Sequence, residues 1–311
     1  MKNLKNYLIL GGCGFIGRHL VKELSENNPE SFITVVDVVK DSGYEKFGNV
    51  EQIQSSLSQI KNFDKLLLNV DIVYHLVSTT TPSDNTEKIM NDFNDTIIPT
   101  IHLLQCMKLY TNKKVIFVSS GGTVYGEAEN SPIPETHSLN PVCTYGTQKV
   151  ILEKYIEVYG HLHNVDYIIA RLSNPYGTGQ NIKKNQGIIP IFVRKILNYE
   201  SLQIWGDGNT VRDYIFIDDA IGALQKLGNY KGNEHIFNIG SGVGYSINEI
   251  VNLIVKELEV EMPQVEYLDS RKCDVKENIL DISKIVNILN WKPEVSIEDG
   301  ILQTIKLHKD S

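Results

Sequence analysis

Tyr145 and Lys149 lie four residues apart in a stretch whose apolar spacing predicts a helix. Helix positions four apart share one face, so the phenol and the ammonium group would point into the same space. A nearby cation favours the phenolate, and a tyrosine, whose unperturbed pKa is about 10, could then accept a proton from a substrate hydroxyl near neutral pH. Tyr110 and Lys114 have the same spacing, which chance alone can produce. The surrounding sequence must therefore decide which pair is catalytic.

Residues 11–17 read Gly-Gly-Cys-Gly-Phe-Ile-Gly, between a short apolar run and a helical pattern. A strand, a glycine-rich turn and a helix in this order are typical of a dinucleotide-binding unit. Gly11 would permit the tight turn, Gly14 would let a pyrophosphate approach bare backbone, and Gly17 would let the helix pack close to the strand. The phosphates of a dinucleotide would then lie at the helix N-terminus.

Asp37 closes a second apolar run, about 20 residues after the glycine turn. At that position its carboxylate would accept hydrogen bonds from both ribose hydroxyls of the adenosine half and would repel a 2′-phosphate. The coenzyme would accordingly be NAD rather than NADP. The alternative is an acid that merely ends a strand in solvent, and the preceding glycine turn favours the coenzyme role.

Strand and helix patterns alternate through the first half of the chain. Apolar runs predict strands at residues 7–10, 33–37, 49–54, 71–77, 113–119 and 165–172. Helical patterns lie between them at residues 18–24, 58–68 and about 85–110. This alternation predicts an α/β fold of the Rossmann type, with a doubly wound parallel sheet and a ligand at the carboxyl ends of its strands. His75 lies at that edge, but its apolar surroundings indicate a structural role.

The alternation loosens near Ser173. We therefore expect a Rossmann domain of residues 1–172 plus about 210–240, which binds NAD. A smaller, interleaved α/β domain of residues 173–209 and 241–311 would bind the substrate. Within it, Ser246 predicts a helix N-cap with a capping box.

The composition limits the partners of the protein. Lys and Arg number 30 against 38 Asp and Glu, giving a formal net charge of −8. A surface for nucleic acid or an anionic membrane needs clustered basic side chains, so we expect neither partner. The four cysteines are widely spaced, which predicts reduced thiols rather than a metal site or disulfides. No apolar run approaches the ~20 residues of a membrane span, and we expect a cytoplasmic protein.

Further motifs follow the predicted strand that ends at Ser119, and they continue to the end of the chain. They are Thr-Val-Tyr-Gly at 123–126, Asn-Pro-Tyr-Gly at 174–177, Gly-Asp-Gly at 206–208, Arg-Asp-Tyr at 212–214, Phe-Asn-Ile-Gly-Ser-Gly at 237–242, Arg271 with Asp274, and Trp-Lys-Pro at 291–293. With the glycine turn, Asp37 and the Tyr145–Lys149 pair, these motifs make the chain resemble the extended short-chain dehydrogenase/reductases. Within that family it is similar to the NAD-dependent nucleotide-sugar epimerases of the UDP-glucose 4-epimerase type.

The resemblance implies a reaction and its residues. Tyr145 would remove the C4 hydroxyl proton while hydride passes to NAD, Lys149 would hold the ribose, and hydride would return to the other face of a 4-keto sugar. Cofactor contacts are implied for Gly11, Gly14, Phe15, Ile16, Gly17, Asp37, Leu76, Ser119, Tyr145 and Lys149. Contacts with a UDP-sugar are implied for Thr123, Asn174, Arg212, Arg271 and Asn278. A homodimer would form through the Tyr145 helix and the long helix before it.

Two regions depart from the family pattern. The family usually has Ser or Thr at the position of Gly121, so Ser120 or Thr123 must supply the third catalytic hydroxyl. We prefer Thr123, because related epimerases often bind substrate with a Thr there. Ser55 and Ser56 replace an Asp that is common near adenine, and a seryl hydroxyl can still bond the adenine amino group.

Other reactions of the family remain as alternatives. Gly121 and Gly122 stand where dehydratases carry an acidic pair and decarboxylases a Glu, so epimerisation ranks first. A 4-ketoreductase would use the same Tyr and Lys, and a non-catalytic dinucleotide-binding protein is an alternative from another class. Asn278, seven residues after Arg271, stands where bulk limits the C2 substituent in related epimerases. Its small side chain predicts that the N-acetylhexosamine pair could fit as well as UDP-glucose and UDP-galactose.

Overall fold

The computed structural model describes residues 4–82, 86–180 and 187–309. Its strands are β1 (Tyr7–Leu10), β2 (Ile33–Asp37), β3 (Val50–Gln54), β4 (Ile72–His75), β5 (Lys114–Ser120), β6 (Asp166–Leu172), β7 (Asn174–Tyr176), β8 (Leu202–Trp205), β9 (Val211–Phe216), β10 (Ile236–Ile239), β11 (Gly244–Ser246), β12 (Val265–Leu268) and β13 (Glu277–Asn278). Its α-helices are α1 (Phe15–Asn27), α2 (Asp64–Leu67), α3 (Ile89–Asp92), α4 (Ile98–Met107), α5 (Thr144–His163), α6 (Ile188–Leu197), α7 (Ile217–Asn229), α8 (Ile247–Leu258), α9 (Ser283–Leu289) and α10 (Ile297–Lys309). Shorter turns are the 3-10 helices η1 (Ser42–Tyr44), η2 (Leu57–Gln59) and η3 (Thr86–Lys88) and the π-helical turn η4 (Phe93–Ile97).

Seven strands form one sheet in the order β10-β6-β5-β4-β1-β2-β3, and every neighbouring pair is parallel. The strand order runs outward in both directions from β1, which is the doubly wound arrangement that the sequence predicts. All carboxyl ends of these strands therefore meet at one edge, where the order reverses between β1 and β4. The predicted fold class is confirmed.

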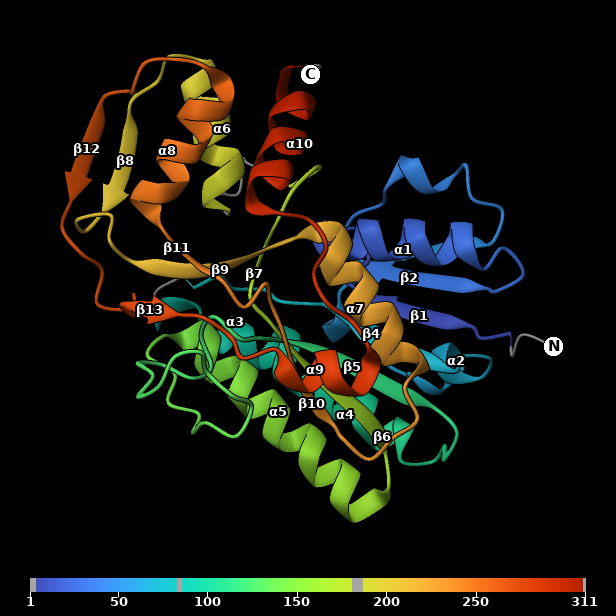
Figure 1. The fold of residues 1–311 in the computed structure, drawn as a ribbon. Coiled ribbons are helices and arrows are strands. Elements are labelled where there is room, and N and C mark those ends of the chain that lie inside the picture. The colour runs from blue at the N-terminus through green and yellow to red at the C-terminus, as the bar shows by residue number, and fades with distance from the viewer. Residues whose placement is uncertain (1–3, 83–85, 181–186, 310–311) are drawn as a thin grey trace.

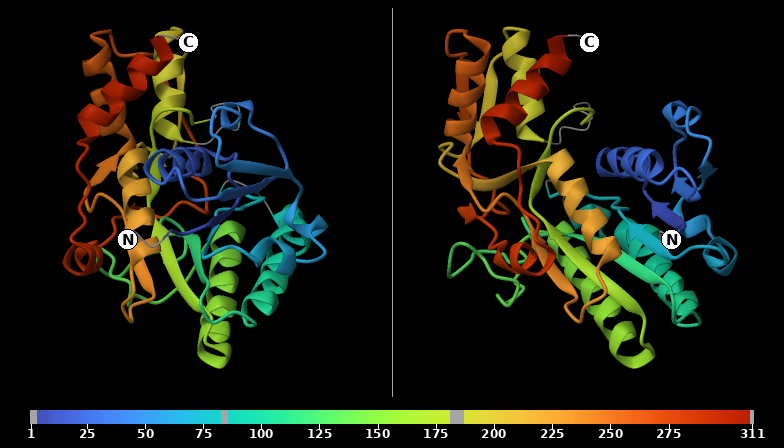
Figure 2. Two further views of the ribbon diagram at one scale, coloured as in Figure 1. Left: turned by 90° about the vertical axis from the view of Figure 1, so that its right-hand side faces the viewer. Right: turned by 45° about the vertical axis from the view of Figure 1, so that its right-hand side comes forward.

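Alternate residues of a central strand enter different cores. Leu8 and Leu10 of β1 lie in a core shared with α2, α4 and α5, whereas Tyr7 and Ile9 lie in one shared with α1 and α7. Successive side chains of a strand point to opposite faces of a sheet, so helices cover both of its faces. Figures 1 and 2 show the sheet between these two helix layers.

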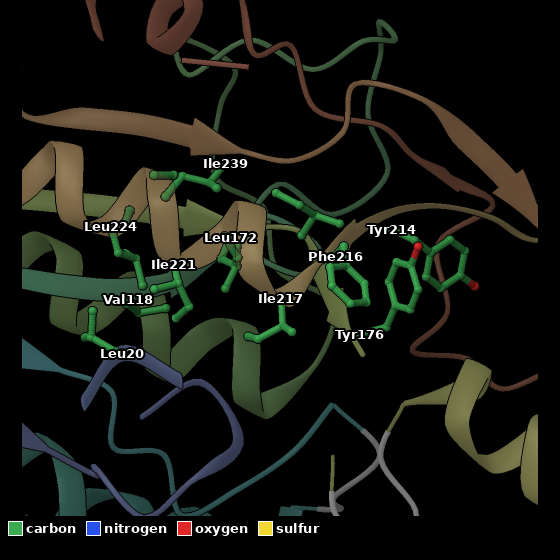
Figure 3. Packing of buried hydrophobic residues seen from close by; sticks show 14 of the residues in the cluster. Leu20, Val118, Leu172, Tyr176, Tyr214, Phe216, Ile217, Ile221, Leu224 and Ile239 are labelled. Atoms are coloured by element: carbon green, nitrogen blue, oxygen red, sulfur yellow. The ribbon is translucent and has the colours of Figure 1, made fainter. Parts of the chain in front are cut away.

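Helix α7 joins the large sheet to the rest of the molecule. Its buried residues Ile217, Ile221 and Leu224 recur at helical spacing, so they form one apolar face. This face lies over the sheet beside Val118 and Leu172 (Figure 3). The same core continues towards the second half through Tyr176, Tyr214 and Phe216.

The second half builds a smaller α/β region. Strand β9 is antiparallel to β11 and parallel to β7 and β13, and β8 pairs with β12. Helices α6, α8 and α10 pack together beside these strands (Figure 1). Helix α8 begins with the predicted capping box, because Ser246 Oγ accepts from the Glu249 amide and the Glu249 carboxylate accepts from the Ser246 amide.

Two predicted helices differ in the structure. The helix expected at 58–68 is wrong, since only η2 and the single turn α2 form there. Asn62 Oδ1 accepts a hydrogen bond from the Asp64 amide, which starts α2 anew instead of continuing a helix. The long helix near 85–110 is divided into α3, η4 and α4, and Pro99 follows the π-helical turn, where it has no N–H to donate. The expected start of that helix at Asn85 lies outside the described residues.

Candidate active site

Tyr145 and Lys149 lie in the first two turns of α5, and their side chains meet as the spacing predicts. Cys143 is the N-cap of this helix, with its Sγ accepting from the Gly146 amide at 3.4 Å. Lys149 Nζ is 5.6 Å from the centroid of the Tyr145 ring and donates to the Val118 carbonyl oxygen at 2.9 Å. The pair therefore stands against the carboxyl end of β5, at the edge where a ligand of this fold binds.

The electrostatic setting of the pair differs from the sequence prediction. Burial raises the pKa of Tyr145 to about 12, and hydrogen bonding with Ser120 acts against this rise. The pKa of Tyr145 thus moves opposite to the direction that a neighbouring Lys149 alone predicts, because the buried phenol has lost its contact with solvent. Burial lowers the pKa of Lys149 to about 8, and the carboxylates of Glu153 and Asp92 oppose that shift. At neutral pH the site accordingly holds a phenol beside an ammonium group.

Ser120 is the hydroxyl that the structure places with Tyr145. The alternative, Thr123, has its Oγ1 buried without a hydrogen-bond partner in the structure. Gly121 lacks a side chain for a steric reason, since a Cβ there would lie 2.5 Å from Cδ1 of Leu280 and 3.0 Å from the Arg171 carbonyl oxygen. Leu280 therefore occupies the space that the usual Ser or Thr of the family would need.

The glycine turn offers bare backbone at the start of α1. Gly11 has φ +83°, and a Cβ on Gly17 would lie 2.5 Å from the carbonyl oxygen of Gly11. Gly14 is the N-cap of α1, where a Cβ would come within 3.3 Å of the same oxygen. Both residues are thus held close to the turn, and α1 presents its free N–H groups at this point.

Asp37 ends β2 beside the glycine turn. Its Oδ2 accepts from the Cys13 amide at 2.9 Å and its Oδ1 from the Val39 amide at 3.3 Å, which fixes the half-buried carboxylate at the sheet edge. Ser55 follows β3 at the same edge, and its amide donates to the Asp37 carbonyl oxygen. A bare phosphate-binding turn with a carboxylate next to it fits a dinucleotide without a 2′-phosphate.

The remaining predicted cofactor residues lie around this edge. Phe15 and Ile16 open α1, and the backbone of Leu76 runs beside Gly11 just after β4. His75 is fully buried and pairs with Thr100 Oγ1 at 2.8 Å. Burial, followed by the charge of Lys149, lowers the pKa of His75 to about 3, so the imidazole is neutral, in agreement with a structural role.

Asp274 brings the two predicted substrate arginines together. Arg271 donates to both of its carboxylate oxygens, at 2.8 and 3.0 Å, and Arg212 Nη2 lies 4.0 Å from Oδ1. Burial lowers the pKa of Arg212, and Asp274 opposes the shift. Two guanidinium groups around one anionic centre could bind another anion with several oxygens in the same way.

The two predicted asparagines connect the second half to the turn that follows β5. Asn174 donates from Nδ2 to the Asp213 carbonyl oxygen at 2.8 Å, and its Oδ1 would lie 3.6 Å from a Cβ on Gly122. Asn278, which is opposite Arg212 in the β9–β13 pairing, is buried and donates to the Gly121 carbonyl oxygen at 3.0 Å. The Oδ1 of Asn278 has no hydrogen-bond partner in the structure.

A buried acid of α5 was not among the predicted site residues. Glu153 lies one helical turn after Lys149 and is paired with Arg171 of β6. Its position four residues beyond Lys149 was a visible signal, but an acid near the middle of a helix is ordinarily a solvated one.

Within residues 4–82, 86–180 and 187–309, no helix is both long and apolar enough to cross a membrane. Over the same part of the chain, no group of three or more His, Cys, Asp or Glu side chains could hold a metal ion.

Comparison with known proteins agrees with this geometry. A model of the NAD dependent epimerase/dehydratase family matches residues 7–240. A putative UDP-glucose 4-epimerase of Methanocaldococcus jannaschii is 35% identical over 98% of both chains, and the dTDP-4-dehydro-6-deoxyglucose reductase of Escherichia coli is 34% identical over 96% of both. The structure of the Thermotoga maritima UDP-glucose 4-epimerase with UDP-glucose is similar with a TM-score of 0.90 and 32% identity, covering 98% of this chain and 99% of that one. The chain therefore belongs to the NAD-dependent epimerase/dehydratase family.

Proposed function

We propose that the protein is a nucleotide-sugar 4-epimerase that inverts C4 of a UDP-hexose through a 4-keto intermediate. The observation that carries the proposal is the grouping of Tyr145, Lys149 and Ser120 at the edge that also holds the dinucleotide turn. The similarity to UDP-glucose 4-epimerases from two organisms supports it. The glycines at 121 and 122 support it as well, because they leave that turn without the acid that dehydration or decarboxylation would use.

NAD is the cofactor of this family, and the residues at the sheet edge fit it. The glycine turn and the N-terminus of α1 would hold the pyrophosphate, Asp37 the adenosine ribose, and Lys149 the nicotinamide ribose. When bound, NAD supplies the acceptor and donor of hydride for the transient oxidation at C4. Because the same hydride returns to the sugar, the reaction consumes no coenzyme.

Tyr145 would handle the proton in this reaction. In its phenolate form, its Oη would take the proton of the C4 hydroxyl, and would return it when the alcohol forms again. Ser120 would stabilise the phenolate by donating its hydroxyl hydrogen to Oη, and the ammonium group of Lys149 would favour the same charged form. Both groups would act against burial, which raises the pKa of Tyr145 above its ordinary value.

The second half of the chain would hold the nucleotide end of the substrate. We assign Arg212 and Arg271 to the diphosphate, since both already surround one carboxylate. Asn174 lies beside Gly122 in the turn that follows Ser120, and Thr123 belongs to the same turn, so we assign both to the sugar. Fixing the nucleotide at a distance would let the keto sugar rotate without leaving the site.

The division into two domains is part of the same proposal. Residues 1–172 with about 210–240 would bind NAD, which the return of α7 and β10 to the large sheet supports. Residues 173–209 and 241–311 would bind the nucleotide sugar. Strand β9, at the boundary, carries Arg212 into the smaller set of strands.

Asn278 bears on the choice of sugar. Its side chain turns into the protein to reach the Gly121 carbonyl oxygen, so it adds no bulk to the outer side of the turn. We therefore propose that UDP-N-acetylglucosamine is accepted as well as UDP-glucose. Conversion of the glucose pair with no conversion of the N-acetylated pair would contradict this part of the proposal.

A 4-ketoreductase is the second candidate, because a reductase of Escherichia coli is 34% identical over 96% of this chain. Such an enzyme would use Tyr145 and Lys149 on a keto sugar and would consume reduced coenzyme. Asp37 disfavours NADPH as that coenzyme.

The deciding experiment is incubation of the purified protein with UDP-glucose or UDP-N-acetylglucosamine without added coenzyme. Epimer formation, followed by NMR or chromatography, with no net NADH would support the main proposal. An absolute requirement for a 4-keto nucleotide sugar and reduced coenzyme would support the reductase. NAD binding without turnover of any nucleotide sugar would support a non-catalytic protein.

We also propose a homodimer through α4 and α5. Apolar side chains on their outer faces are exposed, including Ile98, Tyr155, Val158 and Leu162. A cavity of about 490 Å³ lies at the N-terminal end of the same faces, lined in part by Phe93 and Ile151. An apolar face on paired helices suits packing against a second copy of the same helices.

A further inference from the structure

Glu153 is a fully buried acid in the catalytic helix, with relative exposure of 0%. Arg171 of β6 approaches it with two nitrogens, Nη2 at 2.7 Å from Oε2 and Nε at 3.2 Å from both oxygens. Ser119, at the end of β5, also donates its hydroxyl to Glu153 Oε1. A buried carboxylate with this many donors is held in one position.

The partner Arg171 is itself anchored on its other side. Its Nη1 donates to Tyr125 Oη and to the Glu135 carbonyl oxygen, both at 3.0 Å. Tyr125 in turn donates to Asn238 Oδ1 of β10 at 2.6 Å. Although burial opposes it, Glu153 raises the pKa of Arg171, so the guanidinium stays charged. The network thus fixes the carboxylate from β5, β6 and β10 together.

Lys149 of the proposed catalytic pair lies on the same helix as Glu153. It stands four residues before Glu153 on α5, so the two side chains share a helix face. The other titratable or charged groups around Lys149 are Tyr145 on the same helix, Asp92 at the end of α3 and His75 at the end of β4. Of these, Tyr145 and His75 are uncharged at neutral pH, so only Asp92 shares the role of counter-charge with Glu153.

The position of Lys149 makes a counter-charge necessary. Only 2% of the residue is exposed, and Phe117 covers its ammonium group, with Nζ 4.9 Å from the ring centroid. Burial drives such a lysine towards its neutral form, which is why its pKa falls to about 8. A neutral amine would donate more weakly to a ribose and would not favour the Tyr145 phenolate.

We propose that Glu153 is a positioning residue that keeps Lys149 charged, with Arg171 holding the carboxylate in place. This inference rests on the function proposed above only in giving Lys149 a catalytic purpose. The ion pair therefore has a role besides stabilising the fold, where a buried pair by itself contributes little net stability. Its effect reaches the substrate through Lys149 and not by contact.

Glu153→Gln is the central variant, since it removes the charge and keeps the shape. An NMR titration of protein labelled with 13C at lysine Cε measures the titration midpoint of Lys149 directly. The Lys149 signal is assigned by its loss in Lys149→Arg. We expect the midpoint to fall by about one pH unit in Glu153→Gln. The alkaline limb of kcat/KM, wherever turnover is measurable, should move to lower pH by the same amount. The titration requires no substrate, so it tests this inference even if the proposed reaction is wrong.

Arg171→Lys is the matched control. It keeps a positive charge beside Glu153 but loses the two-pronged contact, so it disturbs the structure without removing the carboxylate. We expect a lower melting temperature and an unchanged Lys149 midpoint. Glu153→Asp should reverse most of the fall in the Lys149 midpoint seen in Glu153→Gln, because it returns the charge.

A neutral double variant, Glu153→Gln with Arg171→Met, covers the case in which unpaired Arg171 prevents folding of the single variant. It should fold and should also show the lowered midpoint. If the Lys149 midpoint is unchanged in the single or double Glu153→Gln variant, whichever of them folds, the proposal is overturned. An equal fall of the midpoint in Arg171→Lys would also overturn it. The ion pair would then be a purely structural feature.

Discussion

Tyr145 shows how strongly its neighbours determine what one residue can do. Its spacing from Lys149 predicts a lowered pKa, yet burial raises the pKa to about 12. Ser120 supplies the hydrogen bond that acts in the other direction. The catalytic form of the tyrosine therefore depends on the hydroxyl at the end of β5 as much as on the lysine in its own helix.

Replacing Tyr145 by Phe should reduce turnover by about 10²- to 10⁴-fold, because the proton of the sugar hydroxyl then has no acceptor. NAD binding should persist, since the glycine turn and Asp37 are unchanged. The measurement is steady-state turnover together with the NAD content of the purified protein. Tyr110→Phe is the matched control, being the other tyrosine with a lysine four residues later, and it should retain full activity.

Ser120→Ala should lower turnover more than Thr123→Val. A hydrogen bond to a charged group contributes about 1.5–3 kcal/mol, which corresponds to a loss of about 10- to 150-fold. The loss of Thr123 removes a hydroxyl with no partner within the described structure, so its effect should fall mainly on KM. Comparison of kcat and KM for the two variants tests the assignment, and the opposite ranking would return the third catalytic hydroxyl to Thr123.

Lys149 makes the folded protein less stable at neutral pH. Its pKa is about 8 in the folded chain against an ordinary value of 10.5, so below pH 8 the folded state carries a charge that burial disfavours. This penalty disappears as pH rises from about 8 towards 10.5. Lys149→Met should therefore raise the free energy of unfolding at pH 7 by up to about 3 kcal/mol, with a smaller gain at higher pH. Urea denaturation at several pH values measures it, and a variant less stable at pH 7 would contradict the sign.

Among the elements, those defined by local patterns could be predicted from the sequence. The strand, glycine turn and helix at residues 7–27 follow from residues close to one another, and so does the capping box at Ser246. The prediction of a helix at 58–68 was wrong because the apolar spacing there comes from short turns buried against the sheet. Periodicity reports which side chains are buried, and it does not report whether the backbone between them is helical.

Contacts between distant segments could not be read from the sequence. The clash that explains Gly121 comes from Leu280, and the hydrogen bond of Asn278 reaches Gly121 across 157 residues. The pairing of Glu153 with Arg171 likewise joins a helix to the next strand through a buried contact. The first two contacts depend on the packing of the C-terminal segment with Asn278 and Leu280 against the turn after β5. The third depends on the packing of α5 against the sheet. No local pattern encodes any of these contacts.

The close packing of Leu280 against Gly121 leads to a prediction about stability. Gly121→Ser, which restores the usual residue of the family, should cost about 1–3 kcal/mol by overpacking against Leu280. The same change should cost less in a Leu280→Val background, because Cδ1 is then absent. Thermal or urea unfolding of the four proteins gives the coupling. Gly122→Ser is the control, since a Cβ there meets nothing closer than 3.6 Å, and a cost equal to that of Gly121→Ser would contradict the steric account.

At the scale of the whole molecule, the proposed dimer depends on the outer face of α5. Val158 and Leu162 are 47% and 63% exposed there. Val158→Glu combined with Leu162→Glu should give a monomer, because charges would be buried between the copies. Sedimentation or light scattering measures the mass. Tyr199→Glu, which changes an exposed aromatic residue after α6, should leave the mass unchanged, and a dimeric double variant would place the interface elsewhere.

Asp274 gives the proposed substrate site an internal competitor. Its carboxylate already neutralises Arg271 and lies near Arg212, so an incoming diphosphate must exchange with an existing anion rather than enter an uncompensated positive field. Such an exchange changes the net charge of the pocket less than simple addition would, so the affinity for nucleotide should depend only weakly on ionic strength. The Asp274 carboxylate would also bind the arginines again as the product leaves, which favours rapid release of the product. Asp274→Asn should accordingly bind the nucleotide more tightly, with a steeper dependence on salt, and release it more slowly.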